Sequence, residues 1–281
     1  MGLKMKFSQP VLVLAFLAIF SGKAAAEGEP VGLPEGARVT SLSLFPAEVV
    51  LGDRYVYRQV LVTAEVEGLG KVDVTRLAKV EGSTELVKVS NGRKVSGLKD
   101  GQGKLVFSLG GQSAELPVKV GDLEAPYKVS FVQDVMPLLA RLGCNSGVCH
   151  GSQKGKNGFK LSLRGYDPLW DHVALTDDLE GRRFNRAAPD KSLFLMKITG
   201  IVPHVGAVRT EADSPYYSLL KSWVGAGVAL DLDAPRVVNL EVFPKEVTLA
   251  LPGMRQQMAA IATFSDGKVR DVSHEAFLSS S

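Results

Sequence analysis

The chain contains two closely similar segments, and this internal repeat constrains its fold more than any other feature. One segment begins at Arg38 with RVTSLSLFPAEVVL, and the other begins at Arg236 with RVVNLEVFPKEVTL. The similarity resumes at GKVDVT (residues 70–75) and at GKVRDVS (residues 267–273), where one residue is inserted. Two segments that share apolar and turn residues in the same order indicate two copies of one structural unit.

The repeated unit has the pattern of β-structure. Apolar and polar residues alternate around Leu42 and Leu44, and they alternate again in residues 59–66, 103–109 and 113–120. Short alternating runs separated by Gly, Asp and Asn turns are typical of a β-sandwich. We therefore expect an all-β domain over residues 37–122 and an incomplete copy of it over residues 235–281.

The Phe-Pro segment, the alternating strand and the Gly-Lys-Val turn resemble the bacterial Ig-like (group 2) module of exported and cell-surface proteins. The second copy reaches Ser281 after only a few strands. A half-sandwich by itself exposes an unpaired edge and an apolar face, which is unfavourable. Two explanations are open: the sequence is a fragment of a longer protein, or its last segment docks on another domain.

The N-terminus predicts export. Lys4 and Lys6 precede an apolar run at residues 11–20, and small residues follow as far as Ala26. This is the pattern of a signal peptide at residues 1–26, although an uncleaved membrane anchor is the alternative. The run is shorter than the ~20 residues that a spanning helix needs, and no second such run follows. We expect a periplasmic or cell-surface protein without a stable membrane span in its mature form.

The charge of the chain argues against one class of partner. The net charge is +3, and Lys and Arg form no dense block. Proteins that bind nucleic acid concentrate basic residues on one surface. We therefore expect no nucleic-acid partner.

Residues 127–230 change from the spacing of strands to the spacing of helices. Ser130 and Gln133 form a capping-box pattern before an amphipathic stripe that continues to Leu142, and Pro137 should kink this helix or begin a second turn segment. A second helix is predicted after Ser214 and Pro215, with Trp223 on its apolar face. This pattern predicts a mainly α domain.

The motif CNSGVCH follows the first of these helices and contains both cysteines of the chain, Cys144 and Cys149. In c-type haem attachment, two cysteines form thioethers and the histidine after the second one binds the iron. His150 occupies that position. Four residues separate the cysteines instead of the usual two, and Gly147 provides backbone freedom for the longer loop.

Other chemistry fits the same residues. A Cys144–Cys149 disulfide is feasible in an oxidising compartment. A tetrahedral zinc site needs four ligands, which His150 and His204 would complete. A thiol-redox centre fits less well, because the usual two-residue spacing is missing. These alternatives remain open at this point.

The run LGCNSGVCHGSQKGKNGFKLSLRGYDP, followed by VPHVG, resembles the cytochrome-c-like domain of planctomycete-type exported proteins, where Ig-like group 2 modules flank it. The resemblance implies a multidomain chain in three parts. These are an all-β Ig-like sandwich, a mainly α cytochrome-c-like domain over residues 127–230 and a partial second sandwich. It also implies one covalent haem c.

The second iron ligand is open between three alternatives. His204 lies in the loop before the last helix, where cytochromes c carry their distal ligand. Met196 is a second candidate, although a methionine among apolar residues is more often a packing residue. The third alternative is an open site. Arg182, Arg183 and Arg209 are candidates for contacts with the haem propionates, or else they are solvated surface charges.

The sequence therefore predicts an electron-transfer module with one haem, relaying electrons to an unidentified redox partner, with the Ig-like units as spacers or attachment domains. A non-redox surface protein with a disulfide and polysaccharide contacts is one alternative. An accessory haem domain of a larger enzyme, whose catalytic domain lies beyond Ser281, is another. Within the chain we find no catalytic triad, paired carboxylates or nucleotide-binding loop, so we expect no catalysis there.

Overall fold

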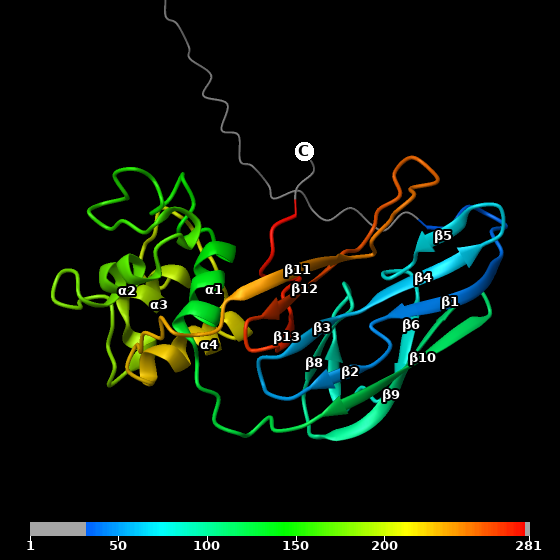
Figure 1. The fold of residues 1–281 in the computed structure, drawn as a ribbon, viewed down its shortest axis with the longest axis horizontal. Helices are drawn as coiled ribbons and strands as arrows, with labels where there is room; N and C mark the ends of the chain where they lie inside the picture. Colours follow the sequence, from blue (N-terminus) through cyan, green and yellow to red (C-terminus); the bar gives the residue numbers. More distant parts are fainter. Residues whose placement is uncertain (1–31, 279–281) are drawn as a thin grey trace, which may run out of the picture. The chain divides into compact units, whose positions relative to one another are not determined.

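The computed structural model describes residues 32–278, so the expected signal peptide at residues 1–26 lies outside the described residues. The first β unit has ten strands in three sheets (Figure 1). The first sheet has the order β1-β4-β5, formed by β1 (Val39–Phe45), β4 (Leu61–Val66) and β5 (Gly70–Asp73). The third has the order β3-β8-β7, formed by β3 (Tyr57–Gln59), β8 (Lys94–Gly97) and β7 (Val87–Val89).

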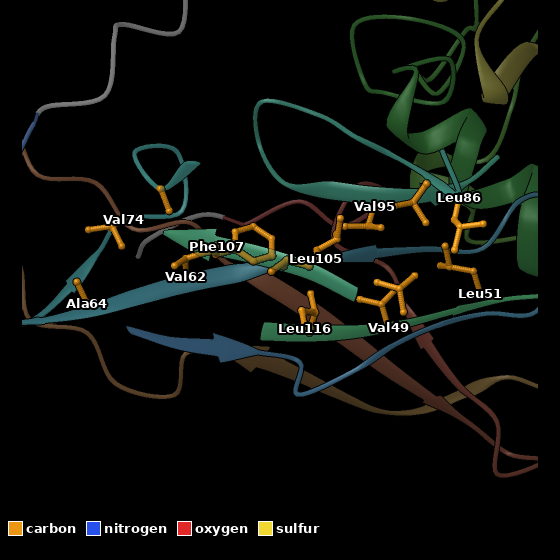
Figure 2. Packing of buried hydrophobic residues seen from close by; sticks show 14 of the residues in the cluster. Val49, Leu51, Val62, Ala64, Val74, Leu86, Val95, Leu105, Phe107 and Leu116 are labelled. Atoms are coloured by element: carbon orange, nitrogen blue, oxygen red, sulfur yellow. The ribbon is translucent and has the colours of Figure 1, made fainter. Parts of the chain in front are cut away.

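The second sheet contains the long hairpin of this unit. Its order is β2-β10-β9-β6, formed by β2 (Val49–Leu51), β10 (Gln112–Val120), β9 (Gly101–Leu109) and β6 (Lys79–Gly82). Strands β9 and β10 pair antiparallel, whereas β2 pairs parallel with β10. Because side chains alternate between faces, Leu105 and Phe107 of β9 point inward, as Leu116 of β10 does. These three residues and Val62 of β4 are fully buried in one apolar core (Figure 2).

Residues between the two β units form short helices joined by long loops. The α-helices are α1 (Met136–Arg141), α2 (Pro168–Thr176), α3 (Leu193–Ile198) and α4 (Pro215–Gly225). A π-turn at Phe131–Val135 precedes α1, and 3-10 turns lie at Leu163–Gly165 and Pro189–Lys191. Their apolar core surrounds Trp223, against which Phe131 stacks with ring centroids 5.3 Å apart.

The expected fold class is wrong in one major respect: a mainly α, cytochrome-c-like domain is not seen within residues 32–278. Only 17% of the described residues are helical, and this part of the chain is mostly β with four small sheets. Glycines with positive φ follow α1, α3 and α4 at Gly143, Gly200 and Gly227, and they stop each helix early. Loops follow the ends of these helices and make up most of the remaining residues between the two β units.

The second copy of the repeat forms a three-stranded sheet of the order β11-β12-β13. Its strands are β11 (Val237–Phe243), β12 (Ala259–Phe264) and β13 (Val269–Asp271). Its register reproduces that of the first copy, because Phe45 pairs with Leu61 and Phe243 pairs with Ala259. A bulge occurs at the same place in β1 and β11. The two segments are therefore copies in structure as well as in sequence.

The two copies contact each other through a reciprocal set of hydrogen bonds. The carboxylate of Asp271 accepts from the backbone N–H of Gln59 at 2.6 Å, and the carboxylate of Asp73 accepts from that of Gln257 at 2.5 Å. Each residue pair occupies equivalent positions of the repeat, so the contact has the isologous pattern of a symmetric dimer. The last segment thus docks on the first β unit.

Candidate metal centre

The loop from Cys144 to His150 closes on itself directly after α1. The backbone N–H of Cys144 donates to the carbonyl of Leu139 at 2.8 Å, which ties the loop to the helix. The N–H of His150 donates back to the carbonyl of Cys144 at 3.0 Å. Both cysteines are free thiols. The closed loop therefore holds two thiols and one imidazole within one short piece of backbone.

Close backbone packing fixes this loop against the segment that follows it. A Cβ atom at Gly151 would lie 2.0 Å from the carbonyl oxygen of Asn145, so the position needs glycine. The backbone N–H of Leu161 donates to the backbone carbonyl of His150 at 2.9 Å. The backbone N–H of Arg164 donates to the backbone carbonyl of Asn145 at 3.0 Å. The side chain of Asn145 is buried, and within residues 32–278 its Nδ2 atom has no hydrogen-bond partner.

The imidazole of His150 has one nitrogen committed and one available. Its Nδ1 atom lies 3.0 Å from the carbonyl oxygen of Phe159, and because a carbonyl only accepts, Nδ1 carries the proton. Burial lowers the pKa of His150, and the nearby His204 and Arg183 lower it as well, while the bond to Phe159 acts in the opposite direction. His150 is thus a neutral imidazole whose Nε2 atom has a free lone pair, the form that binds metals.

His204 presents a second imidazole to the first. Its Nδ1 atom lies 3.2 Å from the carbonyl of Ala207, so its Nε2 atom is also available. The rings of His150 and His204 are parallel within 6°, and their centroids are 6.4 Å apart. Gly206 makes room for this arrangement, because a Cβ atom there would lie 2.8 Å from Cε1 of His204.

Two imidazoles that lie this close could both bind one metal ion, because metal bonds to imidazole nitrogen are about 2.0–2.1 Å long. A carbonyl bond to the other ring nitrogen is the usual orienting contact of a metal-binding histidine. The residues present therefore allow a metal ion to be held by His150 and His204 as a pair.

Arginine side chains reach the same place from two later segments. Nη2 of Arg209 donates to Sγ of Cys149 at 3.7 Å. The guanidinium of Arg183 lies 4.2 Å from the centroid of the Phe159 ring, which itself packs on His150. Burial raises the pKa of the Cys144 thiol to about 12, and Arg209 counteracts this in part. The structure therefore gathers two of the three candidate arginines around the thiols and His150.

The two remaining sequence candidates lie elsewhere. Arg182 and Met196 line a hollow together with Phe184 and Lys191, and neither cysteine and neither of the two facing histidines belongs to it. Within residues 32–278, no three or more His, Cys, Asp or Glu side chains gather as a metal site, so the four-ligand zinc alternative is not assembled. Nε2 of His172 donates to the carbonyl of Val228 at 2.7 Å, an ordinary side-chain hydrogen bond.

Sequence reasoning missed the groups that orient the two imidazoles. The carbonyls of Phe159 and Ala207 hold His150 and His204, yet a backbone carbonyl leaves no mark in the residue type. Phe159 lies in the loop GSQKGKNGFKLSL, whose basic and glycine-rich composition resembled a solvated surface segment. An aromatic residue in such a loop was the available signal, because its ring packs on His150.

No protein-family profile matches the chain, and a search of curated proteins finds no match. Among the helices of the part that the structure describes, none combines the length and the apolar character needed to cross a membrane. The function is therefore inferred from the geometry around Cys144, Cys149, His150 and His204.

Proposed function

We propose that the chain binds one covalently attached haem c through Cys144 and Cys149, that His150 and His204 would bind its iron, and that the protein relays single electrons. The observation that carries this proposal is the pair of parallel imidazoles 6.4 Å apart beside two free thiols. Two thiols followed directly by a histidine are the attachment pattern of this cofactor. When bound, haem supplies a one-electron iron couple.

The residues of the chain have separate tasks in this proposal. Cys144 and Cys149 supply the thiols for thioether attachment. The N–H donated from His150 to Phe159 fixes the rotation of that ring and increases the basicity of the other nitrogen, and Ala207 acts in the same way on His204. With both imidazoles on the iron, the bound haem would favour electron transfer over the binding of oxygen.

Positive charge near the site supports binding of an anionic cofactor. Arg183 and Arg209 lie beside Phe159 and Cys149, where their guanidinium groups are placed for charge-assisted hydrogen bonds to carboxylates. His204 is half-buried and the adjacent Val205 is fully exposed, so one edge of the site is open to a redox partner. The proposal includes export, since the N-terminal sequence has the pattern of a signal peptide and haem c attachment belongs to the same oxidising compartments.

The first test is co-expression with a c-type haem maturation system. We expect a red protein whose reduced α-band persists after denaturation and acid–acetone extraction, because thioethers survive both treatments. The Cys144→Ala, Cys149→Ala double variant should lose all haem during the extraction. A colourless wild-type protein with a Cys144–Cys149 disulfide by mass spectrometry would overturn the proposal and favour the non-redox surface protein.

The second test assigns the axial ligand. His204→Ala should change the absorption spectrum from low-spin to high-spin, since one side of the iron loses its ligand. Met196→Ala is the matched control, because Met196 is the competing candidate and lines a separate hollow. A low-spin spectrum in His204→Ala together with a high-spin one in Met196→Ala would show the ligand assignment to be wrong.

A further inference from the structure

The hollow that contains Arg182 and Met196 combines a positively charged lining with an apolar wall. It has a volume of about 840 Å³ and is lined by residues of α2, of α3 and of the loop that joins them. Its charged lining consists of the cations Arg182, Arg186 and Lys191 and the anion Glu180, so these side chains sum to a charge of +2. Within residues 32–278, none of the four forms an ion pair. A volume of this size is typical of a site for a small molecule.

The apolar wall of the hollow belongs to the core of the middle segment. Phe184, Leu193 and Met196 line it and are half-buried, whereas the three cations are exposed. The ring of Phe184 packs on Trp223 and Phe194, with centroids 5.4 and 5.6 Å away. The wall is therefore fixed by packing, and the charges stand nearer to the solvent. A ligand that fills this space meets apolar atoms on its inner side and cations on its outer side.

The turn that carries Arg182 has an unusual backbone. Leu179, Glu180 and Gly181 have positive φ angles of 57°, 58° and 67°. Residues with a Cβ atom rarely adopt such angles, because that atom comes too close to the following carbonyl oxygen. The turn directs Arg182 to the hollow, whereas Arg183 does not line it. Backbone strain of this kind is concentrated at ligand-binding sites, so the turn independently supports a binding role for this place.

We propose that the hollow binds an aromatic carboxylate. The guanidinium groups of Arg182 and Arg186 take the carboxylate, since arginine presents paired N–H donors that match its two oxygens. The aromatic ring of the ligand lies against Phe184, Leu193 and Met196, and a methionine sulfur is a favourable neighbour for such a ring. An inorganic anion leaves the apolar wall uncovered, and a neutral aromatic molecule leaves the cations unpaired. The proposal is independent of haem binding, because neither the cysteines nor the two facing histidines line the hollow.

The probes are 2-naphthoate and its neutral counterpart 2-naphthamide, which share one ring system and differ in charge. Each is titrated into the whole protein labelled with ¹³C at the methionine methyl groups, and Met196→Leu identifies the signal of Met196. We expect a saturable shift of this signal with 2-naphthoate and at least fivefold weaker binding of 2-naphthamide. Equal affinities of the two probes, or no shift with 2-naphthoate, would overturn the proposal. Inorganic phosphate that binds as tightly as 2-naphthoate would overturn it too, because the apolar wall would then contribute nothing.

Protein variants test the two arginines. Arg182→Gln and Arg186→Gln should each weaken binding of 2-naphthoate at least fivefold and leave binding of 2-naphthamide unchanged, because each removes a positive charge and keeps a polar side chain. Arg164→Gln is the matched control, since Arg164 is exposed in the same segment, lies outside the hollow and changes the net charge by the same amount. If Arg182→Gln and Arg186→Gln both bind 2-naphthoate as tightly as Arg164→Gln does, the carboxylate is not held by these arginines and the proposal is wrong.

Discussion

At the scale of single residues, the candidate metal centre depends on one position without a side chain. Gly151 lies against the carbonyl of Asn145 so closely that a Cβ atom would be 2.0 Å away. This close approach lets His150 donate to Cys144 and brings its ring toward His204. The lack of a side chain at Gly151 therefore helps to set the position of His150.

We predict that Gly151→Ala opens the loop. The added methyl group must displace backbone, so the variant should lose about 1–3 kcal/mol of unfolding free energy, measured by urea denaturation of the protein. Gly147→Ala is the control within the same loop, because its Cβ atom would meet only Leu163, at 3.8 Å. Its loss should be smaller than about 0.5 kcal/mol. Equal losses in the two variants would contradict the close-approach argument.

The residue types predicted the two cysteines and the histidine of the site better than they predicted the surrounding residues that contact them. The spacing of Cys144, Cys149 and His150 marked them as a unit, and the structure places them on one closed loop. The adjacent arginines Arg182 and Arg183 were indistinguishable in sequence, yet only Arg183 lies on Phe159. The geometry of the loop decides which of two neighbouring side chains points toward a site. The local sequence pattern does not reveal this geometry.

At the scale of elements, the sequence predicted where helices begin but not how long they are. Ser130 and Ser214 were predicted as N-caps, and each accepts the expected bond, from Gln133 and Tyr217 respectively. Pro137 was predicted to kink the helix after Ser130 or to begin a second segment, and the second alternative is found: residues 131–135 form a π-turn, and α1 starts one residue before Pro137. Proline fits only the first turn of a helix, so it starts a new one there. Short helices of this kind leave most of the segment to loops.

We predict that Ser214→Ala destabilises α4. The hydroxyl of Ser214 accepts the N–H of Tyr217 at 3.1 Å, and without it one donor of the first turn is unpaired. The unfolding free energy should fall by about 1 kcal/mol, and Ser214→Asp should restore most of it because aspartate also caps helices. Thermal unfolding followed by circular dichroism measures both variants. An equal loss in Ser214→Asp would show that the cap is not the cause.

At the scale of the whole molecule, the repeat predicted two copies but not the contact between them. That contact uses backbone N–H groups of Gln59 and Gln257, which the repeat pattern does not single out. The second copy also departs from the first where it meets the middle segment. Arg270 takes the register position of Val72 and forms an ion pair with the buried Asp134 at 2.6 Å. The inserted residue in GKVRDVS thus replaces a core side chain with an intersegment contact.

His274 belongs to the same contact and makes it sensitive to pH. Its Nε2 atom lies 3.1 Å from Oε1 of Gln59, and its ring packs edge-on against Tyr57. Burial lowers the pKa of His274 to about 4, and the positive charges of Lys94 and Arg141 lower it further. An unfolded histidine has a pKa of about 6.5. Between pH 4 and pH 6.5, His274 is therefore protonated in the unfolded chain but neutral in the folded chain. The stabilising effect of the neutral ring is complete above pH 6.5 and is lost progressively toward pH 4.

We therefore predict that the unfolding free energy of the protein decreases by about 2 kcal/mol more than that of His274→Gln when the pH falls from 7 to 4, an amount that allows for solvent screening of a partly exposed ring. Glutamine has no proton to gain, and its amide can still donate to Gln59. Asp271 and Glu275 have pKa values raised by burial and oppose this trend, but they are present in both proteins. The difference between the two urea-denaturation series thus isolates His274. A constant difference from pH 7 to pH 4 would mean that this ring does not titrate between the two β units.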